Sequence, residues 1–148
     1  MTIIQKAKPE DINPMLNIWL KASLKAHDFI PADYWKNQLI PMRDLYLPLS
    51  ENYVIKEQDN ILGFISLLRA ENVLAALFID PEQQGAGYGK SLVDFLKQQY
   101  DQLHLNVYAD NTSAVGFYQK QGFQIISQGI DENTGQAELN MSWFRSSS

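Results

Sequence analysis

A glycine-rich turn followed by a lysine is the first sign of chemistry in this sequence. Gly85, Gly87 and Gly89 alternate along the chain, and Lys90 comes directly after them. Glycine adopts positive φ readily and puts no side chain between the backbone amides and a ligand. An apolar run precedes the turn and an amphipathic run follows it. The turn would therefore join a strand to the start of a helix, where unpaired amides attract anions. This pattern predicts a phosphate or pyrophosphate site, with the three glycines at positive φ.

Two common phosphate-binding patterns do not fit the spacing of this turn. A Walker A loop requires Gly, four residues and then Gly-Lys-Ser/Thr. Counting back from Gly89 puts Gln84 where the first glycine belongs. The dinucleotide pattern Gly-x-Gly-x-x-Gly would end on Lys90 or on Leu92, depending on its first glycine. What remains is Gln84-x-x-Gly87-x-Gly89 between a strand and a helix. A nucleotide-binding protein that uses the near-Walker run 85–91 stays as an alternative.

A second segment, residues 106–123, has the order of a strand, a helix and the start of a further strand. It contains Asn111-x-x-Ala114-x-x-Phe117-Tyr118 and then Gly122-Phe123. Together with the glycine turn, this segment resembles the GNAT superfamily of N-acetyltransferases. That superfamily has a coenzyme A loop of Arg or Gln, two residues, Gly, one residue, and Gly or Ala. The resemblance is closest to small bacterial members, through the stretches His27-Asp28-Phe29-Ile30 and Tyr34-Trp35.

The resemblance implies a fold, a donor and a reaction. The fold is α/β of the GNAT type, with a mixed, mostly antiparallel central sheet of about seven strands. The sheet is splayed between strands 4 and 5 and is accompanied by about four helices. The donor is acetyl-CoA, and its acetyl group passes directly to a primary amine without a covalent enzyme intermediate. A non-catalytic module that senses acetyl-CoA is the alternative.

The resemblance also implies which residues hold the donor. The pantetheine arm would lie beside residues 73–79 like an added strand, held by backbone groups, although these side chains also suit a core. The pyrophosphate would meet the amides of the glycine turn. Asn111 fits a helix N-cap and also matches a residue that touches the donor. The residues implied for the donor are Leu77, Phe78, Ile79, Gln84, Gly85, Ala86, Gly87, Tyr88, Gly89, Lys90 and Asn111.

Tyr118 matches the tyrosine that protonates the coenzyme A thiolate in many family members. A phenol has a reference pKa of about 10, so it is protonated at neutral pH, as a general acid must be. The alternative is an aromatic residue that only packs beside Phe117. Asn106 departs from the family pattern, because close relatives often have glutamate there as the general base. A carboxamide cannot take up a proton at neutral pH. The candidates for that role are His27, Asp28 and Glu71.

Aromatic residues after the first helix are candidates for the acceptor site. Phe29, Tyr34 and Trp35 match positions where the family's early helices wall that site, and core packing is the alternative for each. His27 and Asn106 complete the candidate acceptor set. An acidic protein with aromatic walls would suit a lysine side chain, an N-terminal amine or a small cationic amine. The sequence does not choose among these acceptors.

Composition sets outer bounds on the fold and the partners. The chain has 148 residues, 45% hydrophobic and 20% charged, which predicts one globular domain over residues 1–148. It shows no apolar run of the roughly 18 residues that a membrane span needs and no secretory signal pattern. The lack of cysteine excludes disulfides and cysteine-zinc sites, and the net charge of -5 argues against broad nucleic-acid binding. We expect a cytoplasmic monomer or homodimer that uses no metal, membrane or nucleic acid.

Hydrophobic periodicity predicts where the elements lie. A helix follows Asp11, and a second helical region runs from about residue 31 to 47, which Pro41 should kink or divide. Further helices follow the glycine turn and cover about 112–121, the latter ending at Gly122. Residues 73–79 are apolar throughout, so this strand should be central and buried on both faces. Other strands are expected at 3–7, 53–57, 61–68, 103–108, 123–127 and 137–143, with a frayed tail at 146–148.

Overall fold

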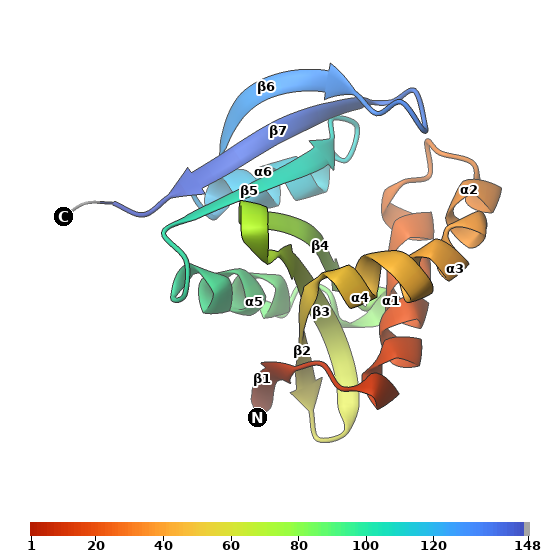
Figure 1. Cartoon of the computed structure of the whole chain (residues 1–148), viewed down its shortest axis with the longest axis vertical. Helices are drawn as coiled ribbons and strands as arrows, with labels where there is room; N and C mark the ends of the chain where they lie inside the picture. The colour runs from red at the N-terminus through yellow and green to blue at the C-terminus, as the bar shows by residue number, and fades with distance from the viewer. Residues whose placement is uncertain (147–148) are drawn as a thin grey trace.

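The chain folds around one seven-stranded sheet that has helices on both faces (Figure 1). The computed structural model describes residues 1–146, so the last two residues of the expected tail lie outside the described part. The strand order is β1-β2-β3-β4-β5-β7-β6, which leaves β1 and β6 at the edges. The strands are β1 (Thr2–Lys6), β2 (Glu51–Glu57), β3 (Asn60–Leu68), β4 (Val73–Ile79), β5 (Gln102–Tyr108), β6 (Gln124–Ile130) and β7 (Ala137–Phe144).

Three longer helices and one broken helical segment accompany the sheet. In Figure 1, α1 lies on the right with the broken segment, and α5 lies on the left. No helix among residues 1–146 is long and apolar enough to cross a membrane. The longer helices are α1 (Ile12–Ala26), α5 (Tyr88–Lys97) and α6 (Thr112–Lys120). The broken segment is α2 (Ala32–Asn37), α3 (Leu39–Pro41), the π-helix η2 (Met42–Tyr46) and α4 (Leu47–Leu49). Single turns are η1 (Pro9–Asp11), η3 (Arg69–Glu71) and η4 (Pro81–Gln83).

The broken segment agrees with the expectation that Pro41 kinks or divides this helical region. The helix α2 stops at Asn37, α3 ends at Pro41, and a π-helix follows directly. Proline has no N–H to bond the carbonyl four residues back, and its ring crowds that carbonyl. The backbone therefore continues with the wider hydrogen bonds of a π-helix. The segment also extends past the expected end, to Leu49.

The sheet opens between β4 and β5, as the predicted GNAT-type fold requires. The other neighbouring strands pair antiparallel along most of their length. In contrast, β4 and β5 are parallel and pair only at Val73 with His104. The pairing of β4 with β3 skips Ala75, which is the extra residue of a β-bulge. Because a bulge bends its strand and increases the local twist, the rest of β4 turns away from β5.

The same opening explains why β4 is not buried on both faces, as we had predicted. Leu74 and Ala76 are buried, but Ala75 is exposed. Leu77 and Ile79 are only partly buried. The apolar run is central in the sheet, yet its far half borders an open cleft instead of a neighbouring strand.

Alternation divides the side chains of β5 between two hydrophobic clusters. Val107 is buried in the cluster that includes α5 and α6, whereas Tyr108 packs in the cluster that includes α1. Asn106 shares the face of Tyr108, since successive side chains on a strand alternate. Antiparallel pairing with β7 places Tyr108 opposite Glu138 and Asn106 opposite Asn140. These four polar-tipped residues therefore share the face of the sheet toward α1.

Candidate active site

A cavity of about 1230 Å³ occupies the opening between β4 and β5. Its wall is built by the glycine turn, β4, β5 and α6, and on the other side by the end of α1 and the broken helical segment. A site for one small ligand usually has roughly 300–1,000 Å³. The cavity is therefore large enough for two reactants that enter from opposite faces of the sheet.

The free edge of β4 presents backbone groups to this cavity. The Asp80 N–H donates to the Leu62 carbonyl of β3 at 2.8 Å. Backbone groups on a strand alternate between its two edges, so those of Phe78 also face β3, while those of Leu77 and Ile79 face the cleft. Because β5 is paired with β4 only at Val73, this edge has no neighbouring ladder. Leu77 and Ile79 can thus bind an extended ligand while their side chains pack in the core.

The glycine turn lies at the end of this edge, and its three glycines have different structural roles. Gly85 has φ +89° and Gly87 has φ +83°, and an added Cβ on either would meet nothing within 4 Å. Gly89 lies inside α5, so the prediction of positive φ was wrong for this residue. A Cβ there would come within 3.3 Å of the Phe117 ring. Position 89 therefore favours a residue without a side chain, because α5 packs closely against Phe117 of α6.

The amides at the start of α5 are available for an anion. The first helical hydrogen bond is donated by the Ser91 N–H to the Gly87 carbonyl at 3.1 Å. The N–H groups of Tyr88, Gly89 and Lys90 thus precede the intrahelical ladder. Lys90 Nζ lies 2.6 Å from Asp94 and Gln84 Nε2 lies 3.4 Å from the Ile79 carbonyl, and both side chains line the cavity. Ala86 is exposed and lies outside the cavity wall.

Tyr118 on α6 lines the cavity and is also packed. Its side chain is only 8% exposed, and its ring contacts Phe117 and Phe123 edge-on. The packing interpretation made from the sequence is therefore confirmed, and the catalytic role stays a prediction. Burial raises the pKa of Tyr118 well above the usual phenol value. The hydroxyl stays protonated across the physiological range, which is the state that a general acid needs.

Asn111 connects the start of α6 to the end of α1. Its Oδ1 accepts the Ala114 N–H at 3.3 Å, which makes it the N-cap, and its Nδ2 lies 3.2 Å from His27 Nε2. Because the cap holds Oδ1, we assign the amide nitrogen as donor and His27 Nε2 as acceptor. The histidine proton then sits on Nδ1, which is buried without a hydrogen-bond partner among residues 1–146.

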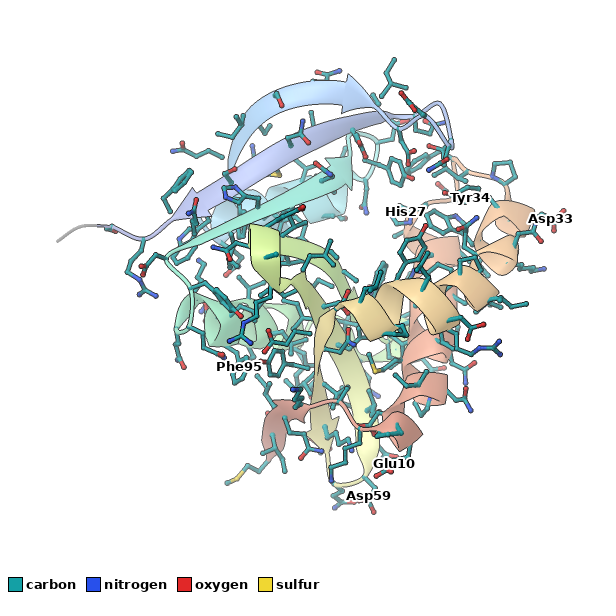
Figure 2. The ribbon with its side chains drawn as sticks, in the orientation of Figure 1. Glu10, His27, Asp33, Tyr34, Asp59 and Phe95 are labelled. Carbon is teal, nitrogen blue, oxygen red and sulfur yellow. The ribbon has the colours of Figure 1, made fainter. Side chains whose placement is uncertain are left out.

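His27 forms the centre of an aromatic wall. Its ring stacks on Trp35 with centroids 5.0 Å apart and meets Tyr108 edge-on at 5.3 Å. Burial lowers the pKa of His27 to about 4, so the ring is neutral at physiological pH. Tyr34 points inward beside His27, whereas its neighbour Asp33 points away from the molecule (Figure 2). His27, Tyr34, Trp35 and Asn106 all line the cavity.

Three residues singled out from the sequence for the acceptor site or as the base lie outside the cavity wall. Phe29 packs behind the wall, with its ring against His27 and Tyr108. Asp28 and Glu71 are exposed at the surface. The structure therefore does not bring either carboxylate to the cavity.

Sequence reasoning missed an acidic group at the acceptor end. The Tyr108 hydroxyl donates a hydrogen bond to Asp131 Oδ2 at 2.5 Å. Glu138 lies directly opposite Tyr108 on β7 and lines the cavity. Burial, and then the charge of Asp131, raises the pKa of Glu138. The period-two pattern of 137–143 could have placed Glu138 on one face of a strand, but not beside β5. No group of three or more His, Asp or Glu residues that could hold a metal ion occurs in the described chain.

Comparison with known proteins assigns the family. The model of the acetyltransferase (GNAT) domain matches residues 7–143. This chain belongs to the GNAT acetyltransferase family. It is 35% identical over 141 residues to the peptidyl-lysine N-acetyltransferase YiaC of Escherichia coli K12, covering 95% of this chain and 96% of YiaC. It is 32% identical over 133 residues to the peptidyl-lysine N-acetyltransferase YjaB of that strain, covering 89% and 88% of the two chains.

Solved structures agree with this family assignment. The solution structure of apo YjaB from Escherichia coli superposes with a TM-score of 0.85 at 30% identity, covering 99% of each chain. The PaiA N-acetyltransferase of Thermoplasma acidophilum, solved with coenzyme A, has a TM-score of 0.82 at 18% identity and covers 97% of this chain and 99% of its own. The latter likeness concerns the fold alone.

The GNAT assignment decides between the functions considered from the sequence. The protein is an acyltransferase that moves an acetyl group to an amine, and a non-catalytic sensor is not favoured. The nucleotide-binding alternative likewise has no support from the family. Acetyltransferases of this fold use acetyl-CoA, and coenzyme A is present in one of the structural neighbours.

Proposed function

We propose that this GNAT protein transfers the acetyl group of acetyl-CoA to the side-chain amine of lysine residues in proteins. The names of its relatives YiaC and YjaB support this acceptor. One structural observation carries the choice of a protein over a small amine. Apolar side chains of the broken helical segment surround the acceptor side of the cavity and remain exposed, among them Tyr46 at 51% and Leu49 at 68%.

This apolar rim is more than a small amine requires. Ile40 and Leu45, on the same segment but outside the cavity wall, are also at least half exposed. Clustered exposed apolar side chains around a pocket are typical of a surface that contacts another macromolecule. A lysine can extend its long apolar stem into such a pocket while the surface around it meets the rim. An aromatic wall and a nearby carboxylate, Glu138, suit the cationic tip.

On the donor side, we propose that the free edge of β4 holds the pantetheine arm and the glycine turn holds the pyrophosphate. The cleft-facing backbone of Leu77 and Ile79 supports the first assignment. The positive φ of Gly85 and Gly87 and the unpaired amides of Tyr88, Gly89 and Lys90 support the second. These features fit the donor without any metal ligand.

In this proposal, Tyr118 acts as the general acid. A backbone N–H of the β4 edge polarises the thioester carbonyl, which favours attack by the uncharged amine. The departing sulfur accepts the Tyr118 proton as the C–S bond breaks. The neutral state of His27 matters on the acceptor side, because a cationic imidazole there would repel the acceptor ammonium.

Release of coenzyme A thiol tests the proposal directly. The chain has no cysteine, so a chromogenic thiol reagent sees only the product. Lysine peptides with a blocked N-terminus, and an unfolded bacterial protein rich in lysine, should turn over. Peptides with a free N-terminus but no lysine, spermidine and free amino acids should not. Turnover confined to small amines or N-termini would overturn the lysine assignment. Tight coenzyme A binding without turnover of any acceptor would favour the sensor. The cytoplasmic location, the single domain and the monomeric or dimeric state stay predictions.

A further inference from the structure

The acceptor ammonium must lose a proton before its nitrogen can attack, and the described structure limits what can take it. Asn106 lines the cavity, but its carboxamide has no basic site at neutral pH. His27 already uses its Nε2 lone pair to accept the Asn111 amide. Two carboxylates occur in the cavity wall formed by residues 1–146, Asp110 and Glu138. Asp110 is exposed in the turn that leads into α6, beyond the end of β5.

Strand pairing brings Glu138 close to the position of Asn106. Glu138 pairs with Tyr108, and Asn140 pairs with Asn106, so Asn106 and Glu138 are diagonal neighbours on one face. Diagonal neighbours on an antiparallel pair are about 7–8 Å apart at their backbones, within reach of a long side chain. The face is the acceptor face, because the Tyr108 ring contacts His27. A carboxylate at position 138 on β7 can therefore reach almost the same part of the cavity as a carboxylate at position 106 on β5.

We propose that Glu138 is the general base of this enzyme, taking the acceptor proton directly or through one water. The inference rests on the proposed acetyl transfer to an amine and names a residue for it. The carboxylate that the family often carries on β5 is replaced here by one on the neighbouring strand.

The surroundings of Glu138 suit this role. Its carboxyl group is partly buried, and the nearby charge of Asp131 opposes a second negative charge, so both effects raise its pKa. A carboxylate with a raised pKa is a stronger base toward an ammonium. The other titratable groups on this side lie on β5 and on the helical segments. They are Tyr108 from β5, His27 and Lys25 from α1, Tyr34 from α2 and Tyr46 from η2.

The proton balance of the reaction is simple. The acceptor ammonium gives one proton to Glu138, and the freed lone pair forms the N–C bond to the acetyl carbon. The C–S bond breaks, the sulfur takes the Tyr118 proton, and the nitrogen loses its second proton to solvent as the amide forms. Solvent returns one proton to the Tyr118 oxygen, and Glu138 releases its proton to solvent. The products are the acetylated amine, coenzyme A thiol and one proton.

The test compares the pH dependence of kcat/KM in the parent and Glu138→Gln. A general base typically contributes roughly 10²–10⁴-fold to the rate. The kcat/KM of E138Q should be lower than that of the parent by about 100-fold or more, and its coenzyme A affinity should stay within about twofold. Its kcat/KM should no longer fall on the acid side of the pH profile, the acid limb that the parent should show. Asp131→Asn should move that limb to lower pH, because it removes the charge that raises the Glu138 pKa. Glu132→Gln, an exposed acid in the same turn, is the matched control and should behave as the parent.

A rescue variant separates a chemical role from a structural one. Asn106→Glu combined with E138Q returns a carboxylate to the diagonal position and should recover at least tenfold of the lost rate, with an acid limb. Parent-like rates in E138Q would overturn the inference, and so would slow rates that keep the parent acid limb. A double variant as slow as E138Q would show that the two positions are not equivalent and would also count against it. Because these comparisons require parent turnover, they can fail while the proposed function stands.

Discussion

Asn111 Nδ2 lies 3.2 Å from His27 Nε2, and this hydrogen bond joins the start of α6 to the end of α1 across the opened sheet. The two helices lie on opposite sides of the sheet and share few other contacts. A single amide thus caps the helix that carries Tyr118 and fixes the tautomer of the ring at the centre of the acceptor wall. This contact therefore joins two parts of the cavity wall that come from distant segments of the chain.

The buried His27 predicts a specific pH dependence of stability. Its pKa falls from 6.5 to about 4 on folding, so the unfolded chain binds more protons between these values. The contribution of His27 to the free energy of unfolding should therefore be fully present above pH 6.5. It should fall by about 2–3 kcal/mol as the pH drops to 4, and His27 should cause no further loss of stability below pH 4. Urea unfolding of the parent and of His27→Gln, which keeps an acceptor for Asn111, measures the effect. Equal slopes for the two proteins between pH 4 and 6.5 would contradict it.

Local patterns were enough to predict the segments that form one wall of the cavity. The strand over residues 73–79, the turn at Gly85 and Gly87, and Tyr118 lie within short contiguous segments, and the structure brings all of them to one cavity. The expectation of positive φ failed at Gly89, which is small because of the Phe117 ring. Pro41 divides its helical region as expected, with a π-helix directly after it.

The acceptor half could not be predicted in the same way, because it depends on pairing between distant segments. Glu138 is a diagonal neighbour of Asn106 only through the register of β5 with β7, about which alternation within one strand says nothing. Asp131 accepts the Tyr108 hydrogen bond from a turn, and the spacing of residues along the chain does not identify Tyr108 as the partner of Asp131. The first helix was predicted, but Asp28 and Glu71, two candidates for the base, are exposed and lie outside the cavity wall.

Tyr118→Phe should slow the reaction without weakening donor binding. The variant keeps the ring that packs against Phe123 and removes the proton that we assign to the leaving sulfur. We expect kcat to fall by roughly 10²-fold or more, while the Kd for coenzyme A changes by less than about threefold. Single-turnover thiol release and calorimetry measure the two quantities. A kcat near that of the parent would remove Tyr118 from the general-acid role.

The glycines of the turn should separate into two classes on substitution. Gly87→Ala forces an alanine to positive φ, which costs about 1–2 kcal/mol, and should weaken coenzyme A binding roughly tenfold. Gly89→Ala has helical φ but places a methyl 3.3 Å from the Phe117 ring. It should act on the packing of α5 against α6, visible as a lower thermal midpoint. Gly116→Ala, with open space around its Cβ, is the control. Equal effects of G87A and G89A on affinity would contradict this division.

The apolar rim should matter for protein acceptors and not for small ones. Leu49 is 68% exposed and borders the cavity, so Leu49→Ser removes apolar surface that an acceptor protein can cover while leaving the core intact. We expect kcat/KM for a lysine-rich protein to fall about tenfold, equivalent to about 1.4 kcal/mol of contact. The kcat/KM for the small acceptor Nα-acetyl-lysine amide, measured over a range of high concentrations, should change by less than about twofold. Ile130→Ser, equally exposed on β6 but away from the cavity, controls for a general loss of apolar surface. If L49S slowed both acceptors alike, or neither, the rim would have no part in acceptor choice, and the case for a protein substrate would rest on the relatives alone.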